Sequence, residues 1–216
     1  GLDPEIAKLF PDSFEESSLG SIPKGWRVEQ LGVVAENVSR SFDFSQNNTP
    51  VFINTGDVLS GDFLHSVCTQ KSELPGQAKK ALLVDDILFT EIRPANRRFA
   101  FVHFDPKNYV VSTKFMVIRS KGDISQRLLY RILTTDETLS IFQTVAESRS
   151  GTFPQITFDS VSFLPCVLAP KPLQDAFQLQ IDPIESKILA IKKESRTLAE
   201  TRDSLLPKLM SGEIPV

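Results

Sequence analysis

The sequence has few of the residues that metal sites and nucleotide-dependent enzymes are built from. It contains two cysteines and two histidines, and neither forms a metal-binding cluster. It also has no glycine-rich phosphate loop and no Asp/Asn-Pro-Pro-aromatic motif of adenine methyltransferases. The sequence therefore gives no reason to predict an enzyme, and we expect neither a cofactor nor a metal.

Long apolar runs are missing as well. No run approaches the roughly 18 residues needed to span a bilayer, and no signal peptide is visible. Cys68 and Cys166 are far apart and form no Cys-x-x-Cys motif. Two unpaired thiols in a chain of this size indicate a reducing compartment, so we expect a cytoplasmic protein without a membrane partner.

The remaining candidates for catalysis are weak. His65 and His103 are isolated, and Asp85-Asp86 occupies a predicted turn, where solvated carboxylates are more common than an acid/base pair. Pro11-Asp12 with Glu185-Ser-Lys187 faintly resembles a nuclease pattern, but the first lies in a predicted linker and the second on a predicted helix. A nuclease is thus a poor alternative.

Charge is distributed unevenly along the 216 residues. The net charge is −3, yet residues 79–119 contain eight basic and four acidic side chains, while residues 1–20 contain five acidic and one basic. A local basic surface could bind nucleic acid, and an ordinary solvated surface is the alternative. The length and the hydrophobic content of 41% fit one domain with an appendage.

A heptad pattern fills the last part of the chain. Apolar residues alternate at spacings of four and three, which is the a/d pattern of a coiled coil, broken only by Ser195 and Arg202. The predicted coiled-coil interface consists of Phe177, Ile181, Ile184, Ile188, Ile191, Leu198 and Leu205. The rest of the chain offers no matching helix, so the pattern predicts a partner helix from another half-subunit or a second copy. Pro183 should kink the helix or mark its true start, and Gly212 should end it.

The middle of the chain alternates strand and helix patterns. Residues 51–53, 81–84 and 87–90 are strand-like, and residues 98–118 predict a hairpin around a turn at 105–108. Residues 124–133 have helical spacing. Thr134 and Glu137 predict a capping box for the next helix, whose apolar stripe is Leu139, Phe142 and Val145. A loop over 148–154 and a strand-like run over 161–168 follow.

The segment Arg93-Pro-Ala-Asn-Arg-Arg98 is the densest candidate for DNA contact. Arginine recognises guanine through O6 and N7, and asparagine recognises adenine through N6 and N7. Arg93, Asn96, Arg97 and Arg98 therefore could approach bases or phosphates. A solvated hairpin loop is the alternative.

A second candidate is Arg149-Ser-Gly-Thr152 with Gln155, where backbone N–H groups at a helix end could meet phosphate. The alternative is a helix C-cap at Gly151. Lys79, Lys80 and Lys114 would contact phosphates at most, and Arg40 is weaker still. Composition alone does not divide these side chains into base and phosphate contacts.

Several motifs resemble a known family. Gly1-Leu-Asp-Pro-Glu-Ile, Leu9-Phe-Pro-Asp-Ser-Phe14 and Ile22-Pro-Lys-Gly-Trp26 resemble the central conserved region of type I restriction-modification specificity subunits. Arg202-Asp-Ser-Leu-Leu-Pro-Lys-Leu-Met-Ser-Gly-Glu-Ile214 resembles that family's distal conserved helix. Leu88-Phe-Thr and Ser150-Gly-Thr-Phe-Pro-Gln-Ile156 resemble its variable target-recognition domain.

The resemblance implies a subunit with two target-recognition domains and two antiparallel spacer helices, without catalytic activity of its own. It implies double-stranded DNA, adenine-N6 methyltransferase subunits and restriction/motor subunits as partners. This chain has one recognition domain and one spacer, so we expect the C-terminal half of a full subunit or a half-size subunit.

We therefore predict an α+β protein with three parts: an acidic arm over 1–20, a target-recognition domain over 21–170 and a coiled-coil spacer helix over 171–211. The expected function is recognition of one half of a bipartite DNA target. The alternative is an assembly module that scaffolds methyltransferase subunits without recognising DNA sequence. A homodimer would recognise a palindromic target.

Overall fold

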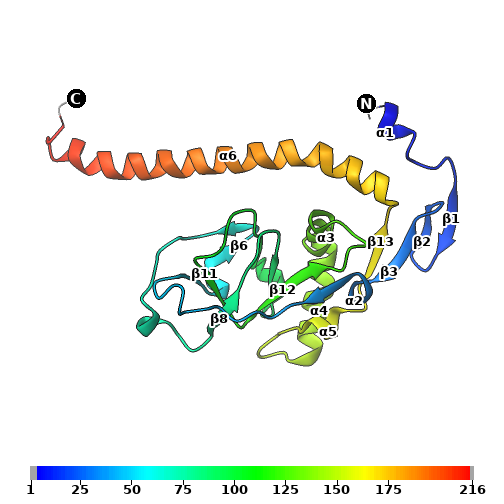
Figure 1. Cartoon of the computed structure of the whole chain (residues 1–216), viewed down its shortest axis with the longest axis horizontal. Coiled ribbons are helices and arrows are strands. Elements are labelled where there is room, and N and C mark those ends of the chain that lie inside the picture. Colours follow the sequence, from blue (N-terminus) through cyan, green and yellow to red (C-terminus); the bar gives the residue numbers. More distant parts are fainter. Residues whose placement is uncertain (1–3, 215–216) are drawn as a thin grey trace. The chain divides into compact units, whose positions relative to one another are not determined.

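A four-stranded antiparallel sheet forms the centre of the first compact unit in the computed structural model, which describes residues 4–214 (Figure 1). Its strand order is β10 (Phe99–Phe101), β9 (Ile87–Thr90), β12 (Phe115–Ser120) and β4 (Ala35–Asn37). Every residue of β9 and β10 is buried. Both faces of this sheet are therefore covered.

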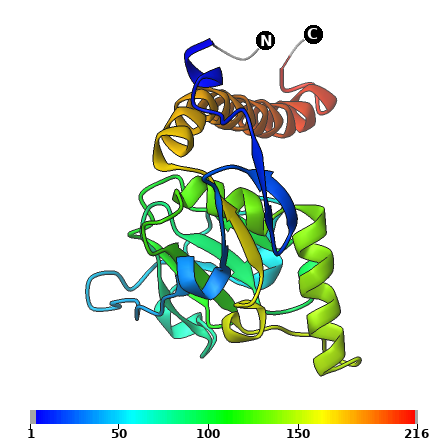
Figure 2. The same ribbon diagram turned by 90° about the vertical axis from the view of Figure 1, so that its right-hand side faces the viewer.

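The two faces belong to different hydrophobic cores. Ile87 and Phe89 point to one core, while Leu88 between them belongs to the other, as the two-residue repeat of a strand requires. Two helices, α3 (Gln126–Leu133) and α4 (Asp136–Arg149), contribute to the first core. In Figure 2, α4 is the yellow-green helix along one flank of the domain.

A second sheet contributes to the other core. Its order is β5 (Val51–Ile53), β11 (Tyr109–Ser112) and β8 (Ala78–Ala81), with β11 parallel to β5 and antiparallel to β8. Short elements surround it, namely η1 (Thr55–Asp57), β6 (Val58–Leu59), β7 (Asp62–Phe63) and η2 (Lys71–Glu73). The domain thus combines helices with a four-stranded and a three-stranded sheet, alongside smaller two-stranded ones.

The predicted hairpin over 98–118 is wrong. A turn does occur there, since the N–H of Tyr109 donates to the carbonyl of Pro106. The strands on its two sides nevertheless enter different sheets, β10 beside β9 and β11 beside β5 and β8. The run to Ile118 also breaks into two strands after Ser112. Alternation within β10 was misleading because both of its faces are buried.

The N-termini of α3 and α4 lie within one or two residues of the positions predicted from the sequence. Ser125 caps α3, and the hydroxyl of Thr135 accepts the N–H of Thr138 at the start of α4. The predicted capping box with Thr134 as N-cap is therefore wrong by one residue. Thr134 instead ends α3, where its N–H donates to the carbonyl groups of Tyr130 and Arg131.

The acidic beginning of the chain carries regular structure. Helix α1 (Pro4–Ala7) precedes an antiparallel hairpin of β1 (Phe14–Ser17) and β2 (Gly20–Pro23). The expected boundary between residues 20 and 21 lies within this hairpin, and residues 1–3 of the expected arm lie outside the described residues. The first compact unit of the chain ends at Gln174 and the second begins at Asp175.

Further short elements complete the first unit. Strand β3 (Arg27–Gln30) pairs antiparallel with β13 (Pro165–Leu168). Helices α2 (Leu31–Val34) and α5 (Phe158–Val161) contribute Leu31, Val34 and Val161 to the first core. The predicted strand-like run over 161–168 is therefore a strand only in its second half.

Helix α6 (Lys171–Met210) is continuous, so Pro183 neither starts nor interrupts it. Gly212 ends it with φ of +73°, and the N–H groups of Gly212 and Glu213 donate to the carbonyls of Leu209 and Lys208. This is a Schellman motif and confirms the predicted glycine C-cap.

Most residues of the predicted coiled-coil interface, which form a seam along α6, are exposed to solvent. Ile184, Ile188 and Ile191 are 56%, 44% and 52% exposed. The predicted α+β domain followed by a long C-terminal helix is confirmed, while the pairing of that helix stays a prediction. Among the described residues, none of the helices is long and apolar enough to cross a membrane.

Candidate nucleic-acid interface

The segment from Thr90 to Arg97 is a loop whose backbone N–H groups are all hydrogen-bonded. It leaves β9, passes through the 3₁₀ turn η3 (Pro94–Asn96) and returns as β10. Every backbone N–H in it has an acceptor: Arg98 O, Lys114 O, Thr90 Oγ1, Pro154 O, Gln143 Oε1, Arg93 O and Pro94 O, in chain order. Pro94 has no N–H and is buried. No backbone N–H of this loop is therefore free to donate to a DNA phosphate.

Two arginines of the loop adopt an unusual backbone conformation. Arg93 has φ and ψ of 44° and 75°, and Arg97 has 54° and 38°. For a residue with a Cβ, adopting this left-handed conformation costs roughly 1–2 kcal/mol relative to the right-handed one. Such conformations persist where surrounding contacts determine the backbone. Here the hydrogen bonds of the loop N–H groups provide those contacts.

The two predicted DNA-contacting loops lie side by side. The N–H of Arg93 donates to the carbonyl of Pro154 at 3.1 Å, and the N–H of Ile156 donates to the carbonyl of Glu91 at 2.8 Å. Ile92 and Gln155 form an antiparallel bridge between these bonds. Arg93 and the segment 149–155, 56 to 62 residues apart in sequence, therefore belong to one surface.

The four candidate side chains of the first loop have different surroundings. The guanidinium of Arg97 forms an ion pair with Asp136 in the first turn of α4. Nη1 of Arg98 donates to the carbonyls of Gly56 at 2.9 Å and Val58 at 3.0 Å. Arg93 and Asn96 are exposed, and neither side chain has a partner among residues 4–214.

Sequence reasoning missed two residues that support the loop. Asp136 pairs with Arg97, and the side-chain oxygen of Gln143, two turns further along α4, accepts the N–H of Ala95 at 3.1 Å. The hollow between the loop and α4 is lined by both, together with Leu139 and Glu147. Their seven-residue spacing on one helix face could have indicated a shared neighbour, but not which one.

The cationic side chains on the second sheet are not equivalent. Lys79 is exposed, whereas Nζ of Lys80 donates to the carbonyl of Phe115 at 2.6 Å. Burial lowers the pKa of Lys80, and the nearby negative charge of Glu91 partly opposes this. Lys114 is half-buried and its carbonyl accepts the N–H of Glu91, while Arg40 is exposed in the segment that pairs with Lys80.

The end of α4 shows that the alternative of a helix C-cap at Gly151 is wrong, while the predicted phosphate contact of this loop stays a prediction. Arg149 is its last residue, and Ser150 is the C-cap in an extended conformation. Gly151 has no positive φ, so it does not cap the helix as a left-handed glycine. Arg149 and Thr152 are exposed, and Gln155 is half-buried in the bridge to Ile92.

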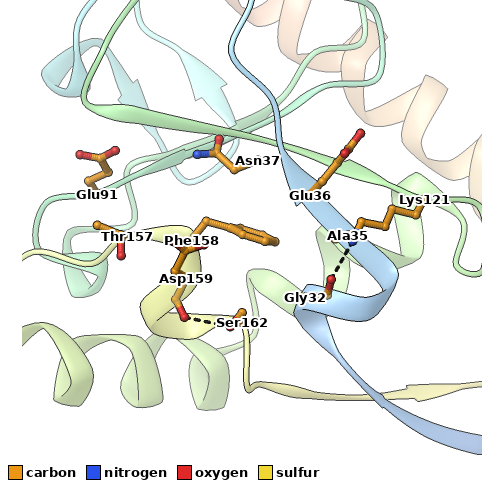
Figure 3. Close-up of a pocket in the computed structure, with 10 residues that line it drawn as sticks. All are labelled: Gly32, Ala35, Glu36, Asn37, Glu91, Lys121, Thr157, Phe158, Asp159 and Ser162. Atoms are coloured by element: carbon orange, nitrogen blue, oxygen red, sulfur yellow. Dashed lines mark hydrogen bonds between the residues drawn. The ribbon is translucent and has the colours of Figure 1, made fainter.

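An acidic hollow lies behind the first loop (Figure 3). Glu36, Glu91 and Asp159 contribute carboxylates to its lining, and its volume is about 610 Å³. The ammonium group of Lys121 donates to the carbonyl of Gly32 at 2.8 Å at its edge. These carboxylates would repel phosphate, so we do not expect the DNA backbone to enter this hollow.

The other predicted polar candidates have structural roles. Asp86 is buried and accepts from Arg119, so the expected solvated turn is wrong for Asp86 and holds only for the exposed Asp85. His65 contacts Asp57 at 3.4 Å, within the capping box of η1. Across the described part of the chain, no group of three or more His, Cys, Asp or Glu residues could hold a metal ion.

Sequence comparison identifies the family. The profile of the type I restriction modification DNA specificity domain matches residues 23–192, which is most of the chain. The chain belongs to this family. The predicted resemblance is thereby confirmed.

Named relatives agree with this membership. The specificity subunit of the type I restriction enzyme HindI of Haemophilus influenzae is 47% identical over 181 residues, which cover 83% of this chain and 39% of that subunit. The MjaIX specificity subunit of Methanocaldococcus jannaschii is 22% identical, covering 90% of this chain and 46% of that subunit. The chain thus spans less than half the length of these relatives.

Solved structures share the fold. The HsdS subunit of Thermoanaerobacter tengcongensis has a TM-score of 0.65 at 19% identity, covering 94% of this chain and 52% of that one. A chain from a type I R-M system, solved to describe complex assembly and conformational transition, has a TM-score of 0.62 at 20% identity, covering 90% and 50%. At these identities the likeness concerns the fold alone.

Proposed function

We propose that this specificity domain recognises one half of a bipartite DNA target, without catalysis of its own. The observation that carries the proposal is the joined pair of loops, Thr90–Arg97 and 149–155, in a chain of this family. Together they offer exposed guanidinium, amide and hydroxyl groups, and the backbone N–H groups of the first loop are all hydrogen-bonded. These groups suit base edges and phosphate oxygens.

The partners follow from the family. We propose that the domain acts with adenine-N6 methyltransferase subunits and with restriction/motor subunits, which would methylate and cleave according to its recognition. The exposed seam of α6 would pair with the other half of a longer subunit or with a second copy of this chain. Such a role belongs in the cytoplasm, where the DNA is.

A selection from random DNA tests the proposal. The chain, assembled with its cognate methyltransferase subunits, would be incubated with a randomised duplex library at about 0.15 M salt, and bound duplexes sequenced. We expect enrichment of a short defined sequence. Binding that is independent of sequence would contradict the proposal and favour a scaffold for methyltransferase subunits.

Light scattering distinguishes the partners of α6. A mass near twice 24.1 kDa would indicate a homodimer and a palindromic target. A monomer would indicate that the helix pairs with a missing half, so that the chain recognises one part of an asymmetric target.

A further inference from the structure

The loop between β9 and β10 divides its four polar side chains into two kinds. Arg93 and Asn96 are exposed and have no side-chain partner among residues 4–214. Arg97 and Arg98 are engaged by Asp136 and by the carbonyls of Gly56 and Val58. Side chains that already bind the protein must lose those bonds before they can bind DNA.

We propose that Arg93 and Asn96 are the side chains of this loop that determine sequence specificity, and that Arg97, Arg98, Asp136 and Gln143 position them. This inference rests on the proposed function. It reduces the role of Arg97 and Arg98 from DNA contacts, as the sequence alone predicted, to supports of the loop.

The chemistry of the two exposed side chains suits base recognition. A guanidinium binds the two acceptors of guanine, and a carboxamide binds the donor and the acceptor of adenine. Both belong to the same short 3₁₀ turn, three residues apart, with the N–H of Asn96 donating to the carbonyl of Arg93 at 2.9 Å. Their backbone positions are therefore fixed relative to each other.

The supports act on three points of the loop. Gln143 accepts the N–H of Ala95 in the middle, Asp136 engages Arg97 at the end, and Arg98 ties the start of β10 to η1 and β6. None of these contacts involves the side chains of Arg93 or Asn96. Loosening a support should therefore lower sequence preference without removing a DNA contact.

Asp136 offers the sharpest test, because two explanations predict different effects of Asp136→Asn on affinity for the selected DNA sequence. If Asp136 were only a negative charge near DNA, Asp136→Asn would strengthen binding to every sequence. If it positions the loop, Asp136→Asn would weaken binding to the selected sequence relative to a scrambled one.

Glu137 provides a matched control. It is also exposed and also in the first turn of α4, but it has no hydrogen-bond or ion-pair partner in the described part of the chain. Glu137→Gln removes the same charge and the same favourable interaction with the helix dipole. It leaves the loop untouched.

The experiment uses the chain assembled with its methyltransferase subunits and two fluorescent duplexes, the selected one and a scrambled one. We expect Arg93→Ala and Asn96→Ala each to reduce the ratio of the two affinities roughly tenfold, and to change which base is preferred at one position. Asp136→Asn should reduce the ratio several-fold with the preferred bases unchanged, and Glu137→Gln should leave it unchanged.

Three outcomes would count against these assignments. Unaltered base preference in Arg93→Ala and Asn96→Ala would overturn the role of the two exposed side chains. Identical behaviour of Asp136→Asn and Glu137→Gln would overturn the positioning role. A wild-type chain that selects no sequence at all is a separate failure, that of the proposed function.

Discussion

Arg119 holds Asp86 through both carboxylate oxygens, with Nη2 to Oδ2 at 2.9 Å and Nε to Oδ1 as the second contact. Asp86 is 1% exposed and also accepts the N–H of Leu83 at 2.7 Å. The pair joins the segment before β9 to β12, and its hydrogen bonds raise the pKa of Arg119. It therefore stabilises the strand that leads into the Thr90–Arg97 loop.

Removing Arg119 should destabilise the domain. Arg119→Ala leaves a buried carboxylate without its counter-ion, which costs about 3–5 kcal/mol for fully buried pairs and about 2–3 kcal/mol here, because Arg119 is 27% exposed. Urea unfolding would measure the loss. Arg119→Lys, which retains the charge but not the two-pronged geometry, should be intermediate. Equal stability of all three proteins would contradict a structural role.

Lys79 and Lys80 should separate binding from stability. Lys79→Met removes an exposed charge, so we expect weaker DNA binding. The slope of the logarithm of the binding constant against the logarithm of the salt concentration should become smaller in magnitude by about one. Lys80→Met removes the hydrogen bond to Phe115, and should cost about 1 kcal/mol of folding free energy with little effect on DNA binding. Salt titrations and urea unfolding of both variants test this. Weaker DNA binding by Lys80→Met, with lower stability of Lys79→Met, would show that Lys80 faces DNA.

The seam of α6 should govern association. Ile188→Asp introduces a charge at an a/d position, and we expect it to abolish self-association or binding of the partner helix. Ala190→Asp places the same residue about 200° around the helix and should have little effect. Light scattering compares the two variants. Intact assembly of Ile188→Asp would show that another surface carries the contact.

The two thiols should differ in reactivity. Burial raises the pKa of Cys166 to about 11, so this thiol stays protonated and shielded at pH 8, whereas Cys68 is exposed. Titration with a thiol-specific reagent at pH 8 should modify one cysteine in the folded protein and both in denaturant. Fast modification of Cys166 in the folded state would contradict its burial in the first core.

Local sequence signals predicted much of the fold. The heptad pattern predicted the long helix, and Gly212 predicted where it ends. Both signals depend on residues only a few positions apart. The partner of β11 could not be predicted this way, because it pairs with β5, some 60 residues earlier in the chain. The 98–118 hairpin failed for the same reason: its turn was correct, and its strands were not neighbours.

The candidate site was predicted in part. Arg93 and the segment 149–155 were recognised as separate loops from their residue types. Their backbone bridge through Ile92 and Gln155 depends on the tertiary fold, as do the supports at Asp136 and Gln143. Whether a basic side chain binds the protein or stays free is decided by such tertiary partners. For this reason the sequence alone did not distinguish Lys80 and Arg98, which bind backbone carbonyls, from Lys79 and Arg93.

The hydrogen-bonded backbone of the Thr90–Arg97 loop has an evolutionary consequence. Because its bonds do not involve the side chains at positions 93 and 96, substitutions there should cost the domain little folding free energy. Mutation could then explore new target sequences without passing through misfolded intermediates. If the loop recognises DNA as proposed, its variable positions would be separated from the contacts that hold its backbone, and the target could change while the fold stays intact.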